Sequence, residues 1–542
     1  MWRRIRQGVQ ILFLGLFVYL LFEAYQGQVA HPWTDVFFRL NPLAALSAML
    51  AGRTWIPRLA LAAITVVATV LLGRVWCGWI CPMGTILEWI RFPRLRWTSE
   101  WASRLQPNPR WRTVKYVLLA LILFASLFGN LTLMVLDPIA ILTRTVTTSV
   151  LPALNYAISS AESALYPIRF FRPVVDLAER VLRGPVLPFS QFFFATNVAA
   201  GLLFAFIVGL NVVAERFWCR YLCPLGGLLG LLSKVALFRR VVTEECNRCA
   251  QCAGACPMDT VEPARGFESD PGECTVCLDC FAECPRSGIQ YRFHAEPVWR
   301  EYDPSRRHVL ASLGASAAGV ALISTSAQVG DPDPHLIRPP GALDESFGDD
   351  EFLSKCIRCG ACIKVCPTAG LQPSGMDQVG FKGLWTPHLV PRLGQCDFGC
   401  HACGQVCPSG AIRPLPLQIK RATVIGRAYI DVNRCLPWAD NIPCAVCEEM
   451  CPVPHKAIVL EVDENAEESD EATTTGHGGR GKGQGRGQAL HQIREGTGVP
   501  KPYVLSSLCI GCGLCEKRCP LNGESAIRVY SPNEPPPPMG YL

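Results

Sequence analysis

The stretch Cys246-Asn-Arg-Cys249-Ala-Gln-Cys252-Ala-Gly-Ala-Cys256-Pro decides the fold of this chain. Its spacing, C-x2-C-x2-C-x3-C-P, is the signature of a domain that holds [4Fe–4S] clusters. Three closely spaced thiolates bind three irons of one cubane, and the fourth, in front of proline, reaches the neighbouring cubane. The stretch therefore predicts an iron–sulfur domain.

The same pattern recurs along the chain, and none of the 28 cysteines falls outside a cluster of metal-ligand spacing. Three more quartets are regular: Cys274, Cys277, Cys280 and Cys284; Cys356, Cys359, Cys362 and Cys366; Cys509, Cys512, Cys515 and Cys519. Two are variants: Cys396, Cys400, Cys403 and Cys407; Cys435, Cys444, Cys447 and Cys451. The remaining cysteines form two C-x3-C-P pairs: Cys77 with Cys81, and Cys219 with Cys223. Six quartets predict six cubanes, and six cubanes predict a path for electrons.

Other uses of cysteine fit this pattern less well. Disulfide frameworks suit small secreted domains, and they are not spaced as a regular triple followed by Cys-Pro. Structural zinc pairs two C-x2-C knuckles across a longer gap, so zinc stays an alternative only for the two variant quartets. Covalent haem needs C-x-x-C-H, and Cys396 lies one residue too far from Cys400-His401.

The chain is long and apolar. With 542 residues, 50 % of them hydrophobic, it is too long for one domain and too apolar to be wholly soluble. Four stretches are long enough to cross a bilayer core of about 30 Å. They are residues 9–25, 55–76, 117–136 and 192–214. The net charge of +6 is modest, and basic residues lie beside these stretches, which excludes a nucleic-acid-binding protein.

Basic residues also predict the orientation, because short loops rich in Lys and Arg stay in the cytoplasm. Arg3, Arg4 and Arg6 precede the first stretch, seven more basic residues lie between the second and third, and Arg74 lies near the end of the second. The loops at 26–54 and 137–191 are less basic for their length and are expected outside. We therefore expect a multi-pass protein of the bacterial cytoplasmic membrane, with its N-terminus and first ferredoxin domain in the cytoplasm.

The membrane part repeats itself. In each half an Asx-Pro turn, at Asn41 or Asp137, comes before the returning span, and Arg-Val-Trp-Cys77 or Arg-Phe-Trp-Cys219 follows it. The second copy carries an insertion. Two like halves about a pseudo-twofold axis would bring both cysteine pairs together, as a shared metal centre or as redox-active pairs; buried thiols without a ligand are the alternative. Trp76 and Trp218 are expected at the membrane interface.

A further targeting signal lies in mid-chain. Ser305-Arg306-Arg307-His-Val309-Leu310 precedes a weakly apolar stretch at 309–327 and is similar to a twin-arginine export signal. Cubanes are built in the cytoplasm, so a domain that carries four of them must cross the membrane already folded. The alternative is that Arg306 and Arg307 anchor an ordinary fifth span. In both cases the last four quartets lie outside.

The predicted fold class is an α-helical membrane domain, with four spans as a duplicated hairpin and a fifth, tethering span, and α+β ferredoxin-like [4Fe–4S] domains on both sides. The predicted domains are 1–240, the four-span part; 241–300, a two-cluster ferredoxin domain; 301–330, the signal-like fifth span; and 331–542, an exported four-cluster domain. The acidic and Gly-rich insert at 463–500 is too polar to form a core and is predicted to be flexible. Short runs after Cys-Pro, at 411–412, 457–460 and 526–529, are expected to be strands.

These motifs resemble two known families. Residues 1–300, with four spans, two C-x3-C-P pairs and two quartets, resemble the NapH membrane proteins of periplasmic nitrate reduction and their NosR and CcoG relatives. Residues 305–542, with the twin-arginine leader, Arg338-Pro-Pro-Gly-Ala and four quartets, resemble the NapG and MauM ferredoxins. The chain is therefore similar to a NapH–NapG fusion. Its second outer quartet departs from the spacing expected for that family, which puts the ligand order there in doubt.

The resemblance implies a quinol dehydrogenase that passes electrons from the membrane quinone pool, through [4Fe–4S] clusters, to an extracytoplasmic reductase or cytochrome in a membrane complex. Clusters on two sides of about 30 Å of hydrocarbon are too far apart for one electron transfer, and a quinone can bridge that gap. Quinol oxidation needs a proton acceptor near the outer face, for which Asp137, with Arg144 and His31, is the candidate site; an Asp before Pro is also an ordinary turn residue. The alternatives are a metal-handling or maturation factor of the CcoG and NosR type, and a relay subunit without a quinone site.

Ligand exchange between quartets is the last expectation. Six cubanes need about 24 irons per chain. In the cytoplasmic domain we expect Cys246, Cys249 and Cys252 to share a cubane with Cys284, and Cys274, Cys277 and Cys280 to share one with Cys256. By analogy with other four-cluster ferredoxins, the first outer quartet is expected to exchange its last cysteine with the fourth, and the second with the third.

Overall fold

The computed structural model describes residues 2–26, 33–90, 109–183, 187–188, 191–293, 314, 336–342, 348–462 and 498–532. The chain forms two compact units: the first holds 1–333, 339–388 and 400–417, and the second holds 334–338, 389–399 and 418–542. These units differ from the predicted domains, because the region of the first outer quartet packs with the N-terminal helices. The twin-arginine pair, the fifth span apart from Gly314, and the insert up to residue 497 lie outside the described residues.

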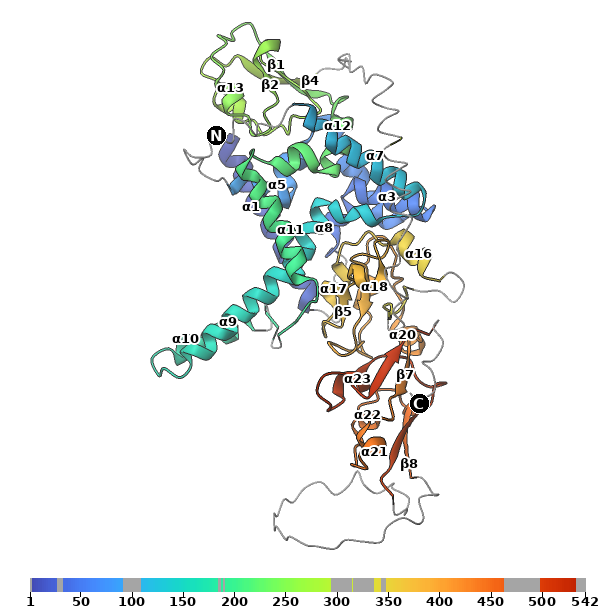
Figure 1. The fold of residues 1–542 in the computed structure, drawn as a ribbon. Helices are drawn as coiled ribbons and strands as arrows, with labels where there is room; N and C mark the ends of the chain where they lie inside the picture. The colour runs from blue at the N-terminus through green and yellow to red at the C-terminus, as the bar shows by residue number, and fades with distance from the viewer. Residues whose placement is uncertain are drawn as a thin grey trace. The chain divides into compact units, whose positions relative to one another are not determined.

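The first unit is built on a bundle of apolar helices (Figure 1). They are α1 (Trp2–Gln26), α2 (Val36–Arg39), α3 (Pro42–Gly52), α4 (Ala62–Leu72), α5 (Pro82–Trp89), α7 (Thr113–Leu127), α8 (Pro138–Thr145), α9 (Leu151–Leu165), α10 (Arg172–Leu182), α11 (Asn197–Gly209) and α12 (Pro224–Ser233). Their apolar sides share one core, in which Leu43, Leu59, Met83 and Leu229 are fully buried.

The bundle consists of two like halves. Asn41 caps α3 and Asp137 caps α8, and each side chain accepts hydrogen bonds from two backbone N–H groups of the first turn. The two caps meet, because Asn41 Nδ2 donates to Asp137 Oδ1 at 2.7 Å. Each half ends in a π-helical turn, η2 (Trp76–Ile80) or η7 (Trp218–Leu222), followed by α5 or α12. The repeat predicted from the sequence is thus present in the fold.

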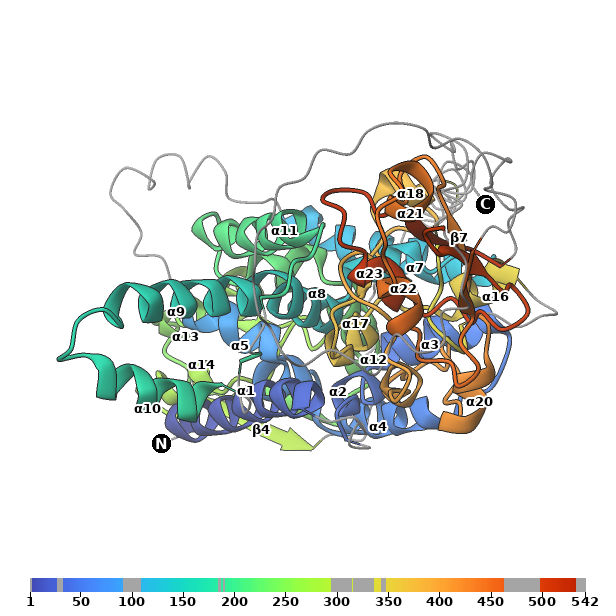
Figure 2. The same cartoon turned by 90° about the horizontal axis from the view of Figure 1, so that it is seen from below.

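The insertion in the second half forms a helical hairpin. Its helices α9 and α10 lie side by side and extend away from the rest of the bundle (Figures 1 and 2). The α10 helix keeps Val175 buried, whereas Val174, Leu177 and Val181 are exposed. The hairpin therefore adds an apolar surface to the second half that the first half lacks.

The helices are shorter than three of the predicted spans. Among the described residues one helix, over Trp2–Glu23, is long and apolar enough to cross a bilayer, and the other predicted spans give apolar helices at 57–72, 113–127 and 197–212. Gly73 ends α4 with φ at 79°, and Gly129 follows α7 with φ at 73°, a left-handed conformation that glycine adopts without strain and that stops a helix. The spans predicted from hydropathy are longer than the helices because hydropathy does not detect such breaks.

A small ferredoxin-like domain follows the bundle. It contains β1 (Phe238–Val242), α13 (Gln251–Gly254), β2 (Val261–Glu262), β3 (Glu268–Ser269), α14 (Asp279–Ala282) and β4 (Ile289–Phe293). Strands β1 and β4 pair antiparallel, with Val242 opposite Ile289, and β2 pairs with β3. The buried core joins Val261, Phe267 and Ile289 to the cysteines. We call it the N-terminal ferredoxin domain; it has the predicted α+β arrangement.

The region of the first outer quartet completes the first unit. Its elements are α16 (Gly348–Lys355), α17 (Ala361–Val365), β5 (Leu371–Pro373), α18 (Met376–Val379), β6 (Pro387–Leu389) and α19 (Ala402–Gln405). Val365, Ala402 and Val406 form its small core. Ala411 and Ile412 are buried in a bend, so the strand predicted at 411–412 is wrong. Burial of these two apolar side chains stabilises the segment without strand pairing.

The second unit is a ferredoxin-like fold with two two-stranded antiparallel sheets. Its elements are α20 (Leu417–Ala422), β7 (Arg427–Ile430), α21 (Leu436–Ala439), α22 (Val446–Glu449), β8 (Ile458–Glu461), β9 (Lys501–Val504), α23 (Leu514–Arg518) and β10 (Ile527–Tyr530). Strand β7 pairs antiparallel with β10, and β8 pairs with β9. Strands β8 and β10 cover the runs at 457–460 and 526–529, which confirms those two predictions.

Candidate iron–sulfur centres and buried thiol pairs

The four regular quartets share one backbone conformation. In each, the second cysteine lies between two residues of positive φ, between 51° and 77°: Arg248 and Ala250, Val276 and Leu278, Arg358 and Gly360, Gly511 and Gly513. A short helix begins directly after the second of these residues. Such turns point successive N–H groups to one side and form the anion-binding concavities found at many iron–sulfur sites. The common spacing thus produces a common cradle that fits a [4Fe–4S] cluster.

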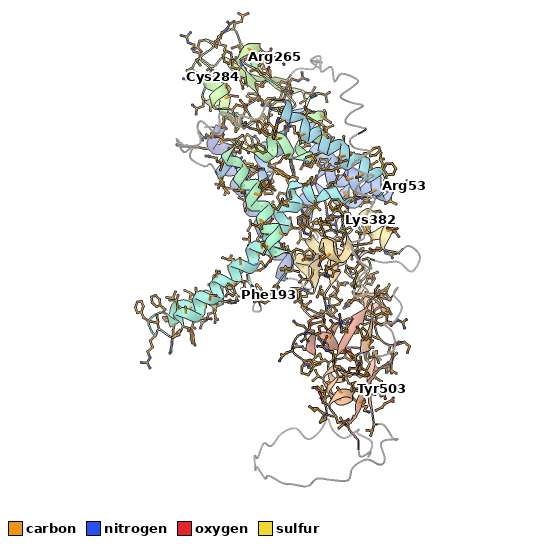
Figure 3. The ribbon with its side chains drawn as sticks, viewed as in Figure 1. Arg53, Phe193, Arg265, Cys284, Lys382 and Tyr503 are labelled. Carbon is orange, nitrogen blue, oxygen red and sulfur yellow. The ribbon has the colours of Figure 1, made fainter. Side chains whose placement is uncertain are left out.

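The two quartets of the N-terminal ferredoxin domain lie together. Burial, aided by the nearby thiols of Cys280 and Cys256, raises the pKa of Cys274 to about 12. Cys256 comes from the other quartet and lies near Cys274, which agrees with its predicted exchange; its role as a ligand stays a prediction. Cys284, labelled in Figure 3, packs against the same core, and its ligand role stays a prediction. Buried thiols of this kind are protonated until a metal replaces the proton.

The first outer quartet packs with the part of the second quartet in the same unit, because Cys400 and Cys403 pack against the core of Val365, Ala402 and Val406. Burial raises the pKa of Cys359, and the next largest contribution to this rise comes from the thiol of Cys407. The thiol of Cys362 is also influenced by Cys356 and Cys407. Cys407 is therefore placed to complete the cubane of Cys356, Cys359 and Cys362, and the exchange predicted between the first and fourth outer quartets is wrong. Cys396, of the second quartet, belongs to the other compact unit.

The third and fourth outer quartets lie together within the second unit. Burial raises the pKa of Cys435 to about 11, with contributions from Cys444 and Cys519. In the reverse direction, Cys451 contributes to the raised pKa values of Cys509 and Cys512, which burial dominates. The exchange predicted between the second and third quartets is therefore wrong as well. The physical reason for this pairing is strand pairing: β7 with β10 and β8 with β9 bring the third and fourth outer quartets side by side.

The two C-x3-C-P pairs lie within electrostatic reach of each other, and their convergence on a shared site stays a prediction. The charge of Cys77 acts on Cys81, Cys219 and Cys223, although the two pairs are far apart in sequence. Cys81 and Cys223 are buried, and Cys77 and Cys219 are partly buried. Among the described residues, however, no three Cys, His, Asp or Glu side chains converge on a single ion position. A cubane does not need such convergence, because each of its thiolates binds a different iron.

Trp76 and Trp218 differ from the prediction. They were expected at the membrane interface, yet only 6 % of Trp76 and 4 % of Trp218 is exposed. Both lie in the π-helical turns that present the first cysteine of each pair. They belong to the core of the bundle.

The predicted quinol residues have well-defined surroundings. Asp137 is a buried helix cap whose carboxylate accepts from Asn41 Nδ2 and from the backbone of Ile139 and Ala140. Arg144 donates to the carbonyls of Val135 and Ala140, and its guanidinium stacks 4.1 Å from the Trp385 ring. A Cβ on Gly360 would lie 2.9 Å from Arg144 Cγ, so Arg144 contacts the loop of the first outer quartet.

These contacts give Asp137 and Arg144 structural roles, and their part in quinol oxidation stays a prediction. His31 lies outside the described residues. The predicted trio is therefore seen only in part.

A buried charge network was missed by the sequence analysis. Glu88 binds Arg6 at 2.7 Å and Arg216 at 2.5 Å, and Arg6 also binds Asp279 of the N-terminal ferredoxin domain at 2.9 Å. A second group joins Glu273 to Arg74 and to Lys115. The signal was the arginine at the same place in Arg-Val-Trp-Cys and Arg-Phe-Trp-Cys, which was read only as a mark of the repeat.

Comparison with known families matches these sites. A 4Fe-4S binding domain model matches residues 54–100 and 196–243, a 4Fe-4S dicluster domain model matches 355–411, and another 4Fe-4S binding domain model matches 502–522. The dicluster match spans the first and second outer quartets and agrees with their pairing. No solved structure matches the chain.

Curated relatives are ferredoxin-type and electron-transport proteins. The methylamine utilization ferredoxin-type protein MauM of Methylorubrum extorquens is 34 % identical over 42 % of this chain and 89 % of its own length. The ferredoxin-type protein NapG of Escherichia coli is 33 % identical over 40 % of the chain and 79 % of its own length, and the putative electron transport protein YccM of the same organism is 26 % identical over 41 % and 51 %. The chain carries several [4Fe–4S] sites, and through 235 of its residues it belongs to the MauM and NapG family of ferredoxin-type proteins.

Proposed function

We propose that the protein is a membrane quinol dehydrogenase that passes electrons from the quinol pool, through its [4Fe–4S] clusters, to an extracytoplasmic reductase or cytochrome. The family supports iron–sulfur electron transfer. Among the described residues, α1 and the five shorter apolar helices at 42–52, 57–72, 113–127, 197–212 and 224–233 support a membrane location. The resemblance of residues 1–300 to NapH proteins supports quinol as the electron donor.

Cluster sites at both ends of the bundle support the proposal. In the first unit, the N-terminal ferredoxin domain and α17 lie at opposite ends of the helices (Figure 1). Arg6 of α1 binds Asp279 at one end, and Lys364 Nζ donates to Leu20 O of the same helix at the other. At a rise of 1.5 Å per residue, these two points of α1 are about 21 Å apart. We call them the ferredoxin end and the α17 end.

An apolar pocket at the α17 end is the observation that carries the quinol assignment. Its empty volume is about 460 Å³, including the open mouth. It lies between α9, α17 and the side chains of Leu187, Pro188, Phe192 and Phe194. Cys366 lines it, so a ring bound there would touch a cluster ligand. Lys364 and Asn155 add polar groups to walls that are otherwise mainly apolar, which is the pattern of a site for an apolar ring with polar substituents.

The predicted residues lie close to this pocket. Arg144 lines a neighbouring pocket that shares Thr147 and Ile363 with the first. We assign Arg144 and Asp137 a positioning role at the α17 end, because their side chains are held by the contacts described above. The quinol hydroxyls would meet Lys364 and Asn155. The two electrons of quinol would pass one at a time to the cubane that Cys366 serves and on to the other clusters, and its two protons would be released to water at the mouth of the pocket.

Substitutions in the pocket test this assignment. Lys364→Met and Asn155→Leu are each expected to slow the reduction of the clusters by a quinol analogue about tenfold to a hundredfold. The reason is that each variant loses one hydrogen bond to the quinol, worth about 1.5–3 kcal/mol. Reduction by dithionite should not change, because it bypasses the pocket. The spectrum of the clusters in anaerobically purified protein gives both rates.

Lys382→Met is the matched control, because Lys382 is an exposed lysine of the same region, paired with Asp350 (Figure 3). Unchanged quinol-dependent rates in both pocket variants would refute the pocket. A wild-type protein that dithionite reduces and no quinol analogue reduces would leave the relay function, and quinol-independent reduction of copper ions would favour the metal-handling function.

Export of the outer clusters is the second part of the proposal. Arg306→Lys with Arg307→Lys is expected to leave residues 330–542 in the cytoplasm, because the twin-arginine route requires both arginines. Protease added to spheroplasts should degrade this region in the wild type and spare it in the double variant, while α1 still inserts. Equal digestion in the two strains would show that Arg306 and Arg307 do not direct export.

A further inference from the structure

Four thiols at the ferredoxin end have no place in the six cubanes. They are Cys77, Cys81, Cys219 and Cys223, which we call the thiol box. Each lies within electrostatic reach of the others, as the influence of Cys77, Cys81 and Cys219 on Cys223 illustrates. Each half of the bundle contributes one pair of thiols, so the thiol box lies between the two like halves.

Buried donors without acceptors surround the box. Trp76 Nε1 and Trp218 Nε1 have no hydrogen-bond partner among the described residues, nor do Nε and Nη2 of Arg74 or Nε and Nη1 of Arg216. Arg74 and Arg216 are 0 % and 1 % exposed, so these donors are closed to bulk water. The same donors recur in both halves, which indicates a common acceptor.

The arginines face the thiols on one side and carboxylates on the other. Arg74 lies within electrostatic reach of Cys77 and Cys223, and Arg216 of Cys219 and Cys77. Arg216 Nη2 also donates to Gly84 O at 3.1 Å, across to the other half. A Cβ on Gly226 would lie 2.9 Å from Arg74 Nη2, so glycine at this position lets the guanidinium approach the start of α12. Two cations thus flank the box from opposite halves.

The backbone favours negative charge at the same place. Cys223 Sγ accepts from Gly226 N at 3.3 Å in the first turn of α12, and Cys81 has the equivalent bond from Gly84 at the start of α5. Helix N-termini stabilise anions through their free N–H groups. The box is therefore prepared for thiolates and for an anionic centre bound by them.

The spacing of the thiols decides what kind of centre fits. No three of the described Cys, His, Asp or Glu side chains converge on one ion position, so the box does not have the shape of a single-ion site. Thiols that are near one another without converging match a centre with several metal atoms. Bridging sulfides would also supply the acceptors that the tryptophan and arginine donors lack.

We propose that the thiol box holds a seventh iron–sulfur centre, bound by two cysteines from each half and hydrogen-bonded by Arg74, Arg216, Trp76 and Trp218. The 4Fe-4S binding domain model matches two segments that contain these pairs and none of the quartets, which agrees with the proposal. The proposal does not depend on the donor of electrons.

The location gives the centre a partner. Trp79 Nε1 donates to Val276 O at 2.9 Å, and a Cβ on Gly78 would lie 2.4 Å from Thr275 O, so the turn after Cys77 packs on the second quartet of the N-terminal ferredoxin domain. Arg216 lies within electrostatic reach of both Cys219 and Cys277. The seventh centre would therefore exchange electrons with the cubane of Cys274, Cys277 and Cys280.

Iron content and spectroscopy of the full-length protein test the proposal. The double variant Cys77→Ser with Cys219→Ser is expected to contain about two fewer iron atoms per chain if the centre has two irons, and about four fewer if it has four. The loss of sulfide should equal the loss of iron. One electron paramagnetic resonance signal of the reduced protein should vanish, and the signals of the six cubanes should stay. Equal iron in the wild type and the variant, or stoichiometric copper or zinc in the wild type, would overturn the proposal.

A milder variant covers the case in which the double cysteine variant does not accumulate. Trp76→Phe with Trp218→Phe keeps the ring shape and removes only the two N–H donors. The potential at which one iron–sulfur signal appears should fall, because the reduced, more negative centre loses two hydrogen bonds, while the total iron stays constant. Trp438→Phe is the control, since its Nε1 donates to Pro502 O in the second unit. A titration identical to that of the wild type would also overturn the proposal.

Discussion

Loss of about four irons per chain is the expected result of Cys407→Ser, because this thiol completes the cubane of Cys356, Cys359 and Cys362. The electrostatic influence of Cys407 on Cys359 and Cys362, and the dicluster match over 355–411, favour this assignment. Serine binds iron poorly compared with a thiolate, so the cubane should be lost or reduced to a labile form. Iron and sulfide analysis of anaerobically purified protein measures the change.

Double variants separate this pairing from the one expected by analogy. Combining Cys407→Ser with Cys356→Ala should cost no more iron than either change alone, since both act on one cubane. Combining Cys356→Ala with Cys519→Ser should cost about eight irons, because the two changes act on different cubanes. The opposite pattern of additivity would return Cys519 to the first outer quartet and refute the structural assignment.

Glu88→Ala should destabilise the bundle by about 3–5 kcal/mol, the range for breaking a buried ion pair by removing one partner. Glu88 is the carboxylate that joins Arg6 of α1 to Arg216 of the second half, and it also accepts from Gln10 Nε2 at 2.9 Å. Without it, Arg216 loses its carboxylate partner and keeps its hydrogen bond to Gly84 O. Thermal unfolding in detergent, followed by tryptophan fluorescence, should show a clearly lower midpoint.

The control for this prediction is Glu351→Ala. Glu351 also pairs with a cation, Lys355, at 2.5 Å, but its side chain is 38 % exposed. Exposed pairs of this kind contribute at most about 1 kcal/mol, so the unfolding midpoint should scarcely move. If the two variants unfolded alike, the network around Glu88 would not hold α1 to the second half.

Local features of the fold could be predicted from the sequence because local forces produce them. The C-x2-C-x2-C spacing fixes a loop whose φ angles repeat at Arg248, Val276 and Arg358, and the strands at β8 and β10 follow Cys-Pro turns as expected. The duplication was also visible, because Asn41 and Asp137 keep the same capping role in both halves. These features depend on neighbours a few residues away.

Other features depend on contacts between distant residues and leave no local pattern. The pairing of the third and fourth outer quartets follows from Ala428 lying opposite Val529, and cysteine spacing does not encode that register. Hydropathy does not detect a break such as the left-handed Gly73, so the predicted spans were longer than the helices. The missing acceptors of Trp76 and Arg216 become apparent only when burial is known.

The bond between Asn41 and Asp137 has a consequence for how the two halves can be joined. In a dimer of identical halves, the same residue would face itself on the axis. Two aspartates there would carry like charges and repel each other, which disfavours their ionisation. A single polypeptide escapes this restriction, since each copy can change alone. The repeat thus behaves as a heterodimer inside one chain: one half supplies the donor, the other the acceptor, and the mismatch itself specifies which halves belong together.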